Sequence, residues 1–209
     1  MNRIFNPENR FWSFTGKLID VFVLHILWII LSVPIVTFGP ATVALYYAIM
    51  TDVSGEQSDW LHAFFHSFRV NFKKAIPLGL IYLLFGIGLG YGIYFYSSVE
   101  KAGTLMSACK TLTIVFSVLY LFSFVYVFPL FARFENSIGI TIRNSFLFSI
   151  KYLWKTILMV IVSIAPYVVI LFTNFLPLIL LGYGLSAYIN SYILNPIFEP
   201  YIQELKNTT

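Results

Sequence analysis

Apolar positions run through the chain in long blocks that are separated by short polar connections. An α-helix needs about 20 apolar residues to cross a hydrocarbon core about 30 Å thick. Blocks of this length occupy residues 18–38, 75–96, 112–131, 154–172 and 175–194. A shorter block at 40–53 begins with Pro40, which suits the first turn of a helix because its missing N–H is not needed there. The pattern predicts five membrane-spanning helices and leaves the sixth, at 40–53, open.

The positions of the basic residues decide whether 40–53 also crosses. Cytoplasmic connections of membrane proteins carry an excess of Lys and Arg. With six spans and both termini in the cytoplasm, eleven of the 13 basic residues lie inside; with five spans, at best eight do. We therefore expect six spans, with the second one short.

Two polar connections are themselves patterned as amphipathic helices. Residues 59–74 place aromatic side chains at every fourth position from Trp60 to Phe72, and cations and histidines on the opposite side. Residues 137–153 have a similar pattern. Such helices lie in the membrane interface. The expected fold is thus all-α: one membrane-embedded domain over 1–209, a polytopic helix bundle with two cytoplasmic interfacial helices.

Composition agrees with a membrane protein and excludes several functions. Hydrophobic residues make up 59% of the 209 residues and charged residues only 11%, too few to cover a water-soluble globule. The single cysteine, Cys109, rules out an internal disulfide or a cysteine-based metal cage. No Ser/His/Asp set, nucleotide-binding motif or paired intramembrane carboxylates occur. We expect no enzyme activity, no cofactor, no metal and no nucleic-acid partner.

The first amphipathic segment contains the nearest approach to a metal site. Asp59, His62 and His66 share its polar face, and the two histidines have the spacing of the zinc-protease helix. Ala63 stands where the general-base Glu of that motif is required, which excludes proteolysis. A solvated helix face is the simpler interpretation.

Two ionisable residues lie in the first span. Such groups are costly in a bilayer and suggest a function by default. Asp20 is near the inner end, where Lys17 one turn earlier offsets its charge. His25 is deeper, and either a hydrogen bond to another helix or a proton-linked role would account for it.

A proline- and glycine-rich turn joins the first two spans. Pro34 removes a helical hydrogen bond, and Gly39-Pro40 turns the chain into the short second helix. Thr37 and Thr42 can satisfy the freed carbonyl groups. Broken helices at membrane depth line binding sites in transporters, whereas a rigid structural hairpin is the alternative.

Small residues are concentrated in two further spans. Gly86/Gly90 and Gly88/Gly92 form overlapping GxxxG pairs, which allow a second helix backbone to approach closely. We expect packing within the bundle, with homo-oligomerisation as the alternative.

The last span carries a polar stripe. Gly182, Ser186 and Asn190 recur at every fourth position, so they share one helix face. An asparagine in a span needs a partner on another helix. This face is expected to point into the bundle.

The run at 31–46, with the pattern SxPxxTxGPATxALY, and the segment 64–74 resemble the YesL-like bacterial integral membrane proteins (domain of unknown function 624). The resemblance implies a multi-pass bacterial plasma-membrane protein of undefined biochemical function, from a family whose genes often lie beside carbohydrate uptake and sensing systems. The family commonly has Asn near the position of His25, and it assigns no catalytic or ligand residues.

Two functions follow from these patterns. The first is a non-enzymatic accessory or scaffold protein that contacts a carbohydrate ABC transporter or a sensor membrane subunit through its small-residue faces. The alternative is a small-solute transporter or channel, with its site between the Pro34–Pro40 region and the polar stripe of the last span.

Overall fold

The computed structural model describes residues 10–56, 59–99, 103–173 and 181–208, and every regular element in these ranges is a helix. In chain order they are α1 (Arg10–Ser32), the 3₁₀-helix η1 (Ile35–Thr37), α2 (Phe38–Ser54), α3 (Trp60–Ser98), α4 (Thr104–Arg133), α5 (Ile138–Lys151), α6 (Leu153–Thr173) and α7 (Gly182–Thr208). The expected all-helical fold is confirmed for these residues.

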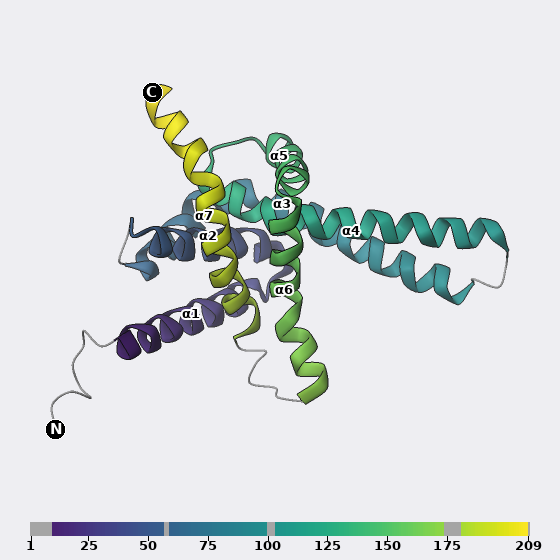
Figure 1. The fold of residues 1–209 in the computed structure, drawn as a ribbon, viewed down its shortest axis with the longest axis horizontal. Coiled ribbons are helices and arrows are strands. Elements are labelled where there is room, and N and C mark those ends of the chain that lie inside the picture. The colour runs from purple at the N-terminus through teal and green to yellow at the C-terminus, as the bar shows by residue number, and fades with distance from the viewer. Residues whose placement is uncertain (1–9, 57–58, 100–102, 174–180, 209) are drawn as a thin grey trace.

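Helix α2 lies at the centre of the molecule, in contact with α1, α3, α4 and α7 (Figure 1). Twelve of its 17 residues are buried, including its polar Thr42 and Thr51. A helix of 17 residues is only about 26 Å long. Because protein rather than lipid surrounds α2, its length does not have to match the thickness of the hydrocarbon core.

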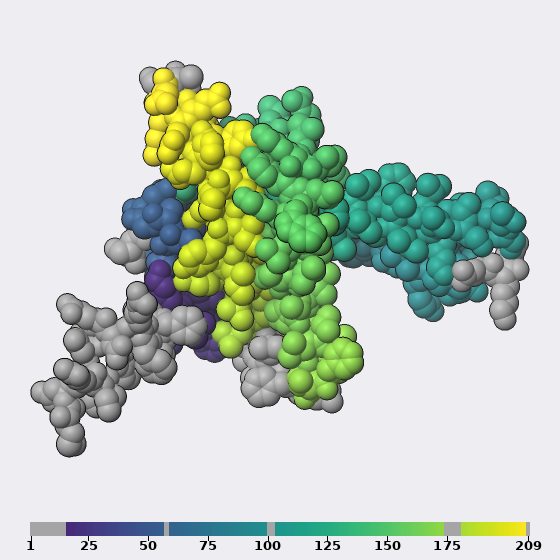
Figure 2. Space-filling model, viewed as in Figure 1, coloured from purple at the N-terminus to yellow at the C-terminus, as the bar shows by residue number. Residues whose placement is uncertain are grey.

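The outer parts of α3 and α4 form an antiparallel pair that extends away from the other helices (Figure 1). The space-filling view shows this pair, in teal, projecting beyond the rest of the molecule (Figure 2). We call it the α3–α4 arm. Helix α6 runs across the direction of the arm (Figure 1).

Three of the described helices, rather than the six expected spans, are long and apolar enough to cross a membrane: α3, α4 and α6. The expected first span, 18–38, is shortened because α1 ends at Ser32. The expected last span, 175–194, begins at residues outside those described. From Gly182 onward it continues to Thr208, through two prolines and several polar residues. The coarse assignment, a helical membrane protein, agrees with the structure.

Pro34 accounts for the early end of α1. A proline disfavours the helical conformation in the residue before it, and Val33 and Pro34 are exposed between α1 and η1. The Thr37 hydroxyl is 2.5 Å from the carbonyl oxygen of Leu31 and 2.7 Å from that of Pro34. It therefore provides a partner for carbonyl groups at the end of α1.

The expected interfacial helix at 59–74 and the expected span at 75–96 are one continuous helix, α3. Asp59 caps its N-terminus by accepting a hydrogen bond from the His62 backbone N–H at 3.0 Å. Pro77 lies inside α3 without ending it. The change from an amphipathic to an apolar pattern near Lys74 thus marks a change of surroundings along one helix, not a helix boundary.

The closest helix crossing joins the start of α2 to α3. A Cβ atom added at Gly79 would lie 2.5 Å from the Cα of Gly39, and one added at Gly39 would overlap the carbonyl oxygen of Ala75. Such a contact is possible only where small residues meet. Ala75 and Gly79, four residues apart on α3, form the surface on which Gly39 packs.

An ion pair connects the ends of α2 and α4. Arg133 donates from both terminal nitrogens to the Glu56 carboxylate, each at 2.7 Å. Hydrogen bonding and the charge of Arg133 lower the pKa of Glu56 from its usual 4.5, against a smaller opposing effect of burial.

This pair predicts a loss of stability in acid. A carboxylate whose pKa is lower in the folded state stabilises the fold fully above its unfolded pKa, and this contribution is lost as the pH falls through the folded pKa. Because the Glu56 side chain is 47% exposed, solvent screening limits the effect to about 1 kcal/mol or less. Glu56→Gln should lower the melting temperature near about pH 7 but not below about pH 3. A difference that persists undiminished in acid would contradict the ion pair.

Candidate functional site

Two of the residues singled out from the sequence, His25 and Thr42, contact Trp28 where α1, α2 and α7 come together. His25 and Trp28 of α1 stack with ring centroids 5.4 Å apart, and Trp28 stacks on Tyr183 of α7 at 4.7 Å. His25 is only 2% exposed. We call His25, Trp28 and Tyr183, together with Thr42 and Tyr46 of α2, the ring cluster.

Helix α2 contributes the polar contact of the ring cluster. The Trp28 indole N–H donates to the Thr42 hydroxyl at 3.0 Å, and that hydroxyl donates to the Phe38 carbonyl oxygen at 2.7 Å. Tyr46 packs edge-on against Tyr183, with centroids 6.4 Å apart. The space between the start of α2 and the start of α7 is therefore filled by packed rings. The Trp28 indole N–H is hydrogen-bonded, whereas the buried Tyr183 hydroxyl has no hydrogen-bond partner among the described residues.

The ring cluster depends on a close approach of α1 and α7. A Cβ atom added at Gly184 would lie 2.7 Å from the Cβ of His25 and 3.2 Å from the carbonyl oxygen of Val21. His25 thus packs directly on the backbone of α7. Sequence reasoning identified His25 but not Gly184, whose signal would have been the second glycine of Gly182-Tyr-Gly184.

The polar stripe of α7 faces α6. Ser186 donates to the Val162 carbonyl oxygen at 3.0 Å, and the Asn190 amide donates to the Ser163 hydroxyl at 2.9 Å. Both Ser186 and Asn190 are buried, and a Cβ atom at Gly182 would contact Pro166. These bonds give Ser186 and Asn190 the interhelical partners expected of the stripe, although the buried Asn190 amide oxygen has no hydrogen-bond partner among the described residues.

One further amide ties α7 to α2. Asn195 donates from its side-chain nitrogen to the Met50 carbonyl oxygen at 3.1 Å. Its oxygen is buried and has no hydrogen-bond partner among the described residues.

Asp20 lies at the edge of the bundle rather than within the ring cluster. Lys17 pairs with Asp52 of α2 at 3.5 Å, although the sequence suggested Asp20 as its partner. Asp20 lines the same small pocket as this pair, together with Trp60 and Tyr188. The pocket holds only about 10 Å³, which is the volume of roughly one water molecule.

The glycines of the arm divide between a covered and an open face. A Cβ atom at Gly86 would lie 2.6 Å from the Tyr120 hydroxyl, and one at Gly92 would lie 3.1 Å from Thr113, so both face α4. Gly88 and Gly90 have no atom within 4 Å of an added Cβ. The Gly86/Gly90 pair is therefore not one continuous interface within the molecule.

On the polar face at the start of α3, one side chain caps the helix N-terminus and two histidines stack on each other. Asp59 is occupied as the helix cap, and the rings of His62 and His66 stack 6.0 Å apart. Within the described ranges, no group of three or more His, Cys, Asp or Glu side chains is placed to hold a metal ion.

Two features of the interior were missed from the sequence. Tyr82 of α3, Ser123 of α4 and Ser145 of α5 form a buried hydroxyl cluster, with neighbouring oxygens 2.5 Å apart at both Tyr82–Ser123 and Ser123–Ser145. The other is the small-residue contact at Gly79. Single hydroxyl residues on three separate helices have no common spacing, so nothing in the sequence connects them.

Comparison with known families identifies one segment of the chain. Residues 21–93 match the family model described as "Protein of unknown function, DUF624". The matched segment extends from α1 through α2 into α3 and so includes the Gly39–Gly79 crossing. No curated protein and no solved structure matches the chain.

Proposed function

We propose, from the match of residues 21–93 to the DUF624 family and the packing described above, that this membrane protein is a non-enzymatic accessory or scaffold protein. Its setting in the proposal is the bacterial plasma membrane, with cytoplasmic termini and a role beside carbohydrate uptake or sensing. The distribution of basic residues supports the orientation, and the sequence resemblance supports the setting.

The observation that carries the proposal is the uncovered surface of the α3–α4 arm (Figure 2). Large apolar side chains on it are more than half exposed: Leu84, Phe85, Ile87, Tyr91, Tyr94, Leu105, Leu112 and Phe116. The open glycines Gly88 and Gly90 interrupt this surface. Since small residues allow helix backbones to approach in a membrane, the arm offers a surface for a transmembrane helix of a partner.

The alternative, a transporter with its site between Pro34–Pro40 and the polar stripe, has less support. Rings of the ring cluster occupy the space between the start of α2 and α7. Ser186 and Asn190 bond to α6, while Gly39 packs on α3. Packing therefore occupies most of these groups, while the buried Tyr183 hydroxyl and Asn190 amide oxygen have no hydrogen-bond partner among the described residues.

Purification in mild detergent tests the proposal. A membrane subunit of a carbohydrate transporter or sensor should copurify with the wild-type protein and be depleted by Gly88→Leu, because the added side chain covers the open face of the arm. Gly16→Leu is the matched control, since Gly16 of α1 is equally open. Recovery of the protein alone from cells grown on several sugars, or equal copurification with both variants, would argue against this function.

A further inference from the structure

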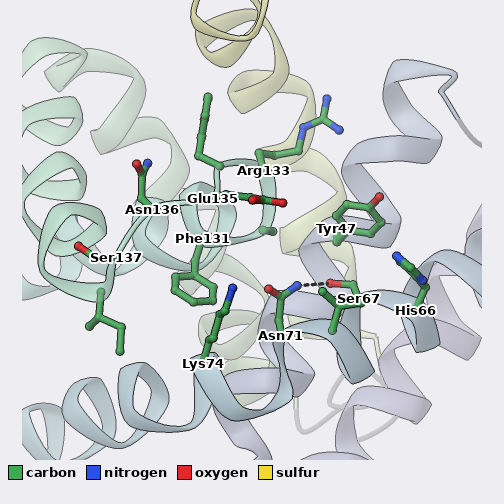
Figure 3. A pocket seen from close by; sticks show the side chains of 14 residues that line it. Tyr47, His66, Ser67, Asn71, Lys74, Phe131, Arg133, Glu135, Asn136 and Ser137 are labelled. Carbon is green, nitrogen blue, oxygen red and sulfur yellow. Dashed lines mark hydrogen bonds between the residues drawn. The ribbon is translucent and has the colours of Figure 1, made fainter. Parts of the chain in front are cut away.

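A cavity of about 640 Å³ lies between α3, the end of α4 and the start of α5 (Figure 3). Its polar lining includes Asn71, Lys74, Glu135, Asn136 and Ser137. Figure 3 shows the Lys74 side chain directed from α3 towards the loop that carries Glu135 and Asn136. Lys74 directly precedes the apolar segment of α3 that the sequence predicts to cross the membrane, so the cavity lies at the level expected for lipid headgroups.

A second, apolar groove of about 340 Å³ follows along the same helices. Carbon-rich side chains of α3, α4 and α5 line it, and the main ones are Ile81, Phe85, Phe116, Leu119, Ile142 and Phe146. The apolar lining of the groove suits a hydrocarbon chain rather than a polar solute.

The cavity and the groove follow one another along α3 and α5, and we take them as two parts of one cleft. On α3, Lys74 lines the cavity, while Ile81 and Phe85 line the groove. Ile81 follows Lys74 by seven positions and Phe85 follows Ile81 by four, so the three residues share one helix face. On α5, Ile138 lines the cavity and Ile142 lines the groove one turn later. The two ends are thus about 10 Å apart along α3, and the cleft changes from polar to apolar over that distance.

The charged residues at the polar end of the cleft indicate which lipid headgroup it can bind. Arg133 also lines the cavity, but Glu56 neutralises it through two hydrogen bonds. Besides His66, the other ionisable residues of the lining are Lys74 and Glu135, one positive and one negative, and both are solvent-exposed. A ligand that carries a phosphate for the ammonium group and an ammonium for the carboxylate matches this pair, whereas an anionic headgroup would meet Glu135 unfavourably.

We propose that this cleft binds one membrane phospholipid with an ethanolamine headgroup. The phosphate lies at Lys74, with Asn71 and Asn136 as hydrogen-bonding neighbours, and the ammonium lies at Glu135. One acyl chain follows the groove between α3 and α5. The assignment does not require the accessory role proposed above. Phe85 and Phe116 belong both to the groove and to the exposed surface of the arm, but the open glycines Gly88 and Gly90 line neither part of the cleft.

Native mass spectrometry of the protein released from nanodiscs containing equal amounts of phosphatidylethanolamine and phosphatidylglycerol tests the assignment. The wild-type protein should retain one phosphatidylethanolamine. Lys74→Gln removes the phosphate partner and should weaken retention about tenfold. Ile81→Trp fills the groove and should displace the lipid. The matched controls are Lys73→Gln and Leu84→Trp, which change neighbouring exposed residues outside the cleft.

The possible results separate the alternatives. Retention lost in both cleft variants and kept in both controls supports the site. Equal retention of the two lipids contradicts the ethanolamine assignment, and equal losses in cleft and control variants contradict the cleft. Binding of soluble glycerophosphoethanolamine that Ile81→Trp leaves unchanged, without lipid retention, would show a site for a free phosphate ester instead. Circular dichroism of each variant establishes that it is folded.

Discussion

Replacing Gly79 by alanine is expected to lower the free energy of unfolding by about 3 kcal/mol. The added methyl group would lie 2.5 Å from the Cα of Gly39 and 2.6 Å from its nitrogen, so it meets backbone rather than a movable side chain. The α2–α3 crossing must open to accommodate it. Titration with a denaturing detergent in mixed micelles, followed by circular dichroism, measures the change.

Gly90→Ala provides the matched control for Gly79→Ala. Both glycines lie within α3, but nothing lies within 4 Å of a Cβ at Gly90. Alanine there should stabilise the helix, by at most about 1 kcal/mol, because it is the better helix former. The two substitutions therefore have opposite expected signs. A similar effect of both would show that Gly79 contributes through helix propensity and not through the close crossing.

Trp28→Ala is expected to lower the free energy of unfolding by about 3 kcal/mol. The change removes the stacking partner of His25 and Tyr183 and leaves the Thr42 hydroxyl without its indole donor. The same detergent titration measures the loss. Trp28→Phe keeps one aromatic ring but removes the N–H and the second ring of the indole, so its loss should be smaller than that of Trp28→Ala.

Trp154→Ala is the control for the ring cluster. Trp154 is 82% exposed at the start of α6, and substitutions at such positions change stability by about 0.5 kcal/mol or less. Equal losses at the two tryptophans would contradict the packing of α1, α2 and α7 described here.

The hydrophobic pattern predicted where helices form better than it predicted which helices pack together. The short block at 40–53 corresponds to α2, Phe38–Ser54, because Gly39-Pro40 and the following apolar run are local signals. The boundary expected between 59–74 and 75–96 is absent because no residue there ends a helix: the polar-to-apolar change reflects the surroundings, while backbone hydrogen bonding continues. Helix ends depend on local chemistry, and helix surroundings do not define them.

The glycines show why the site was predicted only in part. The run from Gly86 to Gly92 gave the more conspicuous spacing, yet the closest crossing uses Gly79 with Ala75. Spacing shows which residues share a face, but the position of the neighbouring helix decides which face is used. For the same reason the sequence could predict that Asn190 has a partner on another helix but could not identify Ser163.

The enclosure of α2 constrains how the chain is assembled during synthesis. Its wall is built partly from α7, which holds the end of α2 through Asn195 and Met50. Helix α7 is synthesised more than a hundred residues after α2. The central helix therefore remains incompletely surrounded until α7 has been made, and a chain cut short before Asn195 would leave α2 exposed to the proteases and chaperones that act on incompletely folded membrane proteins.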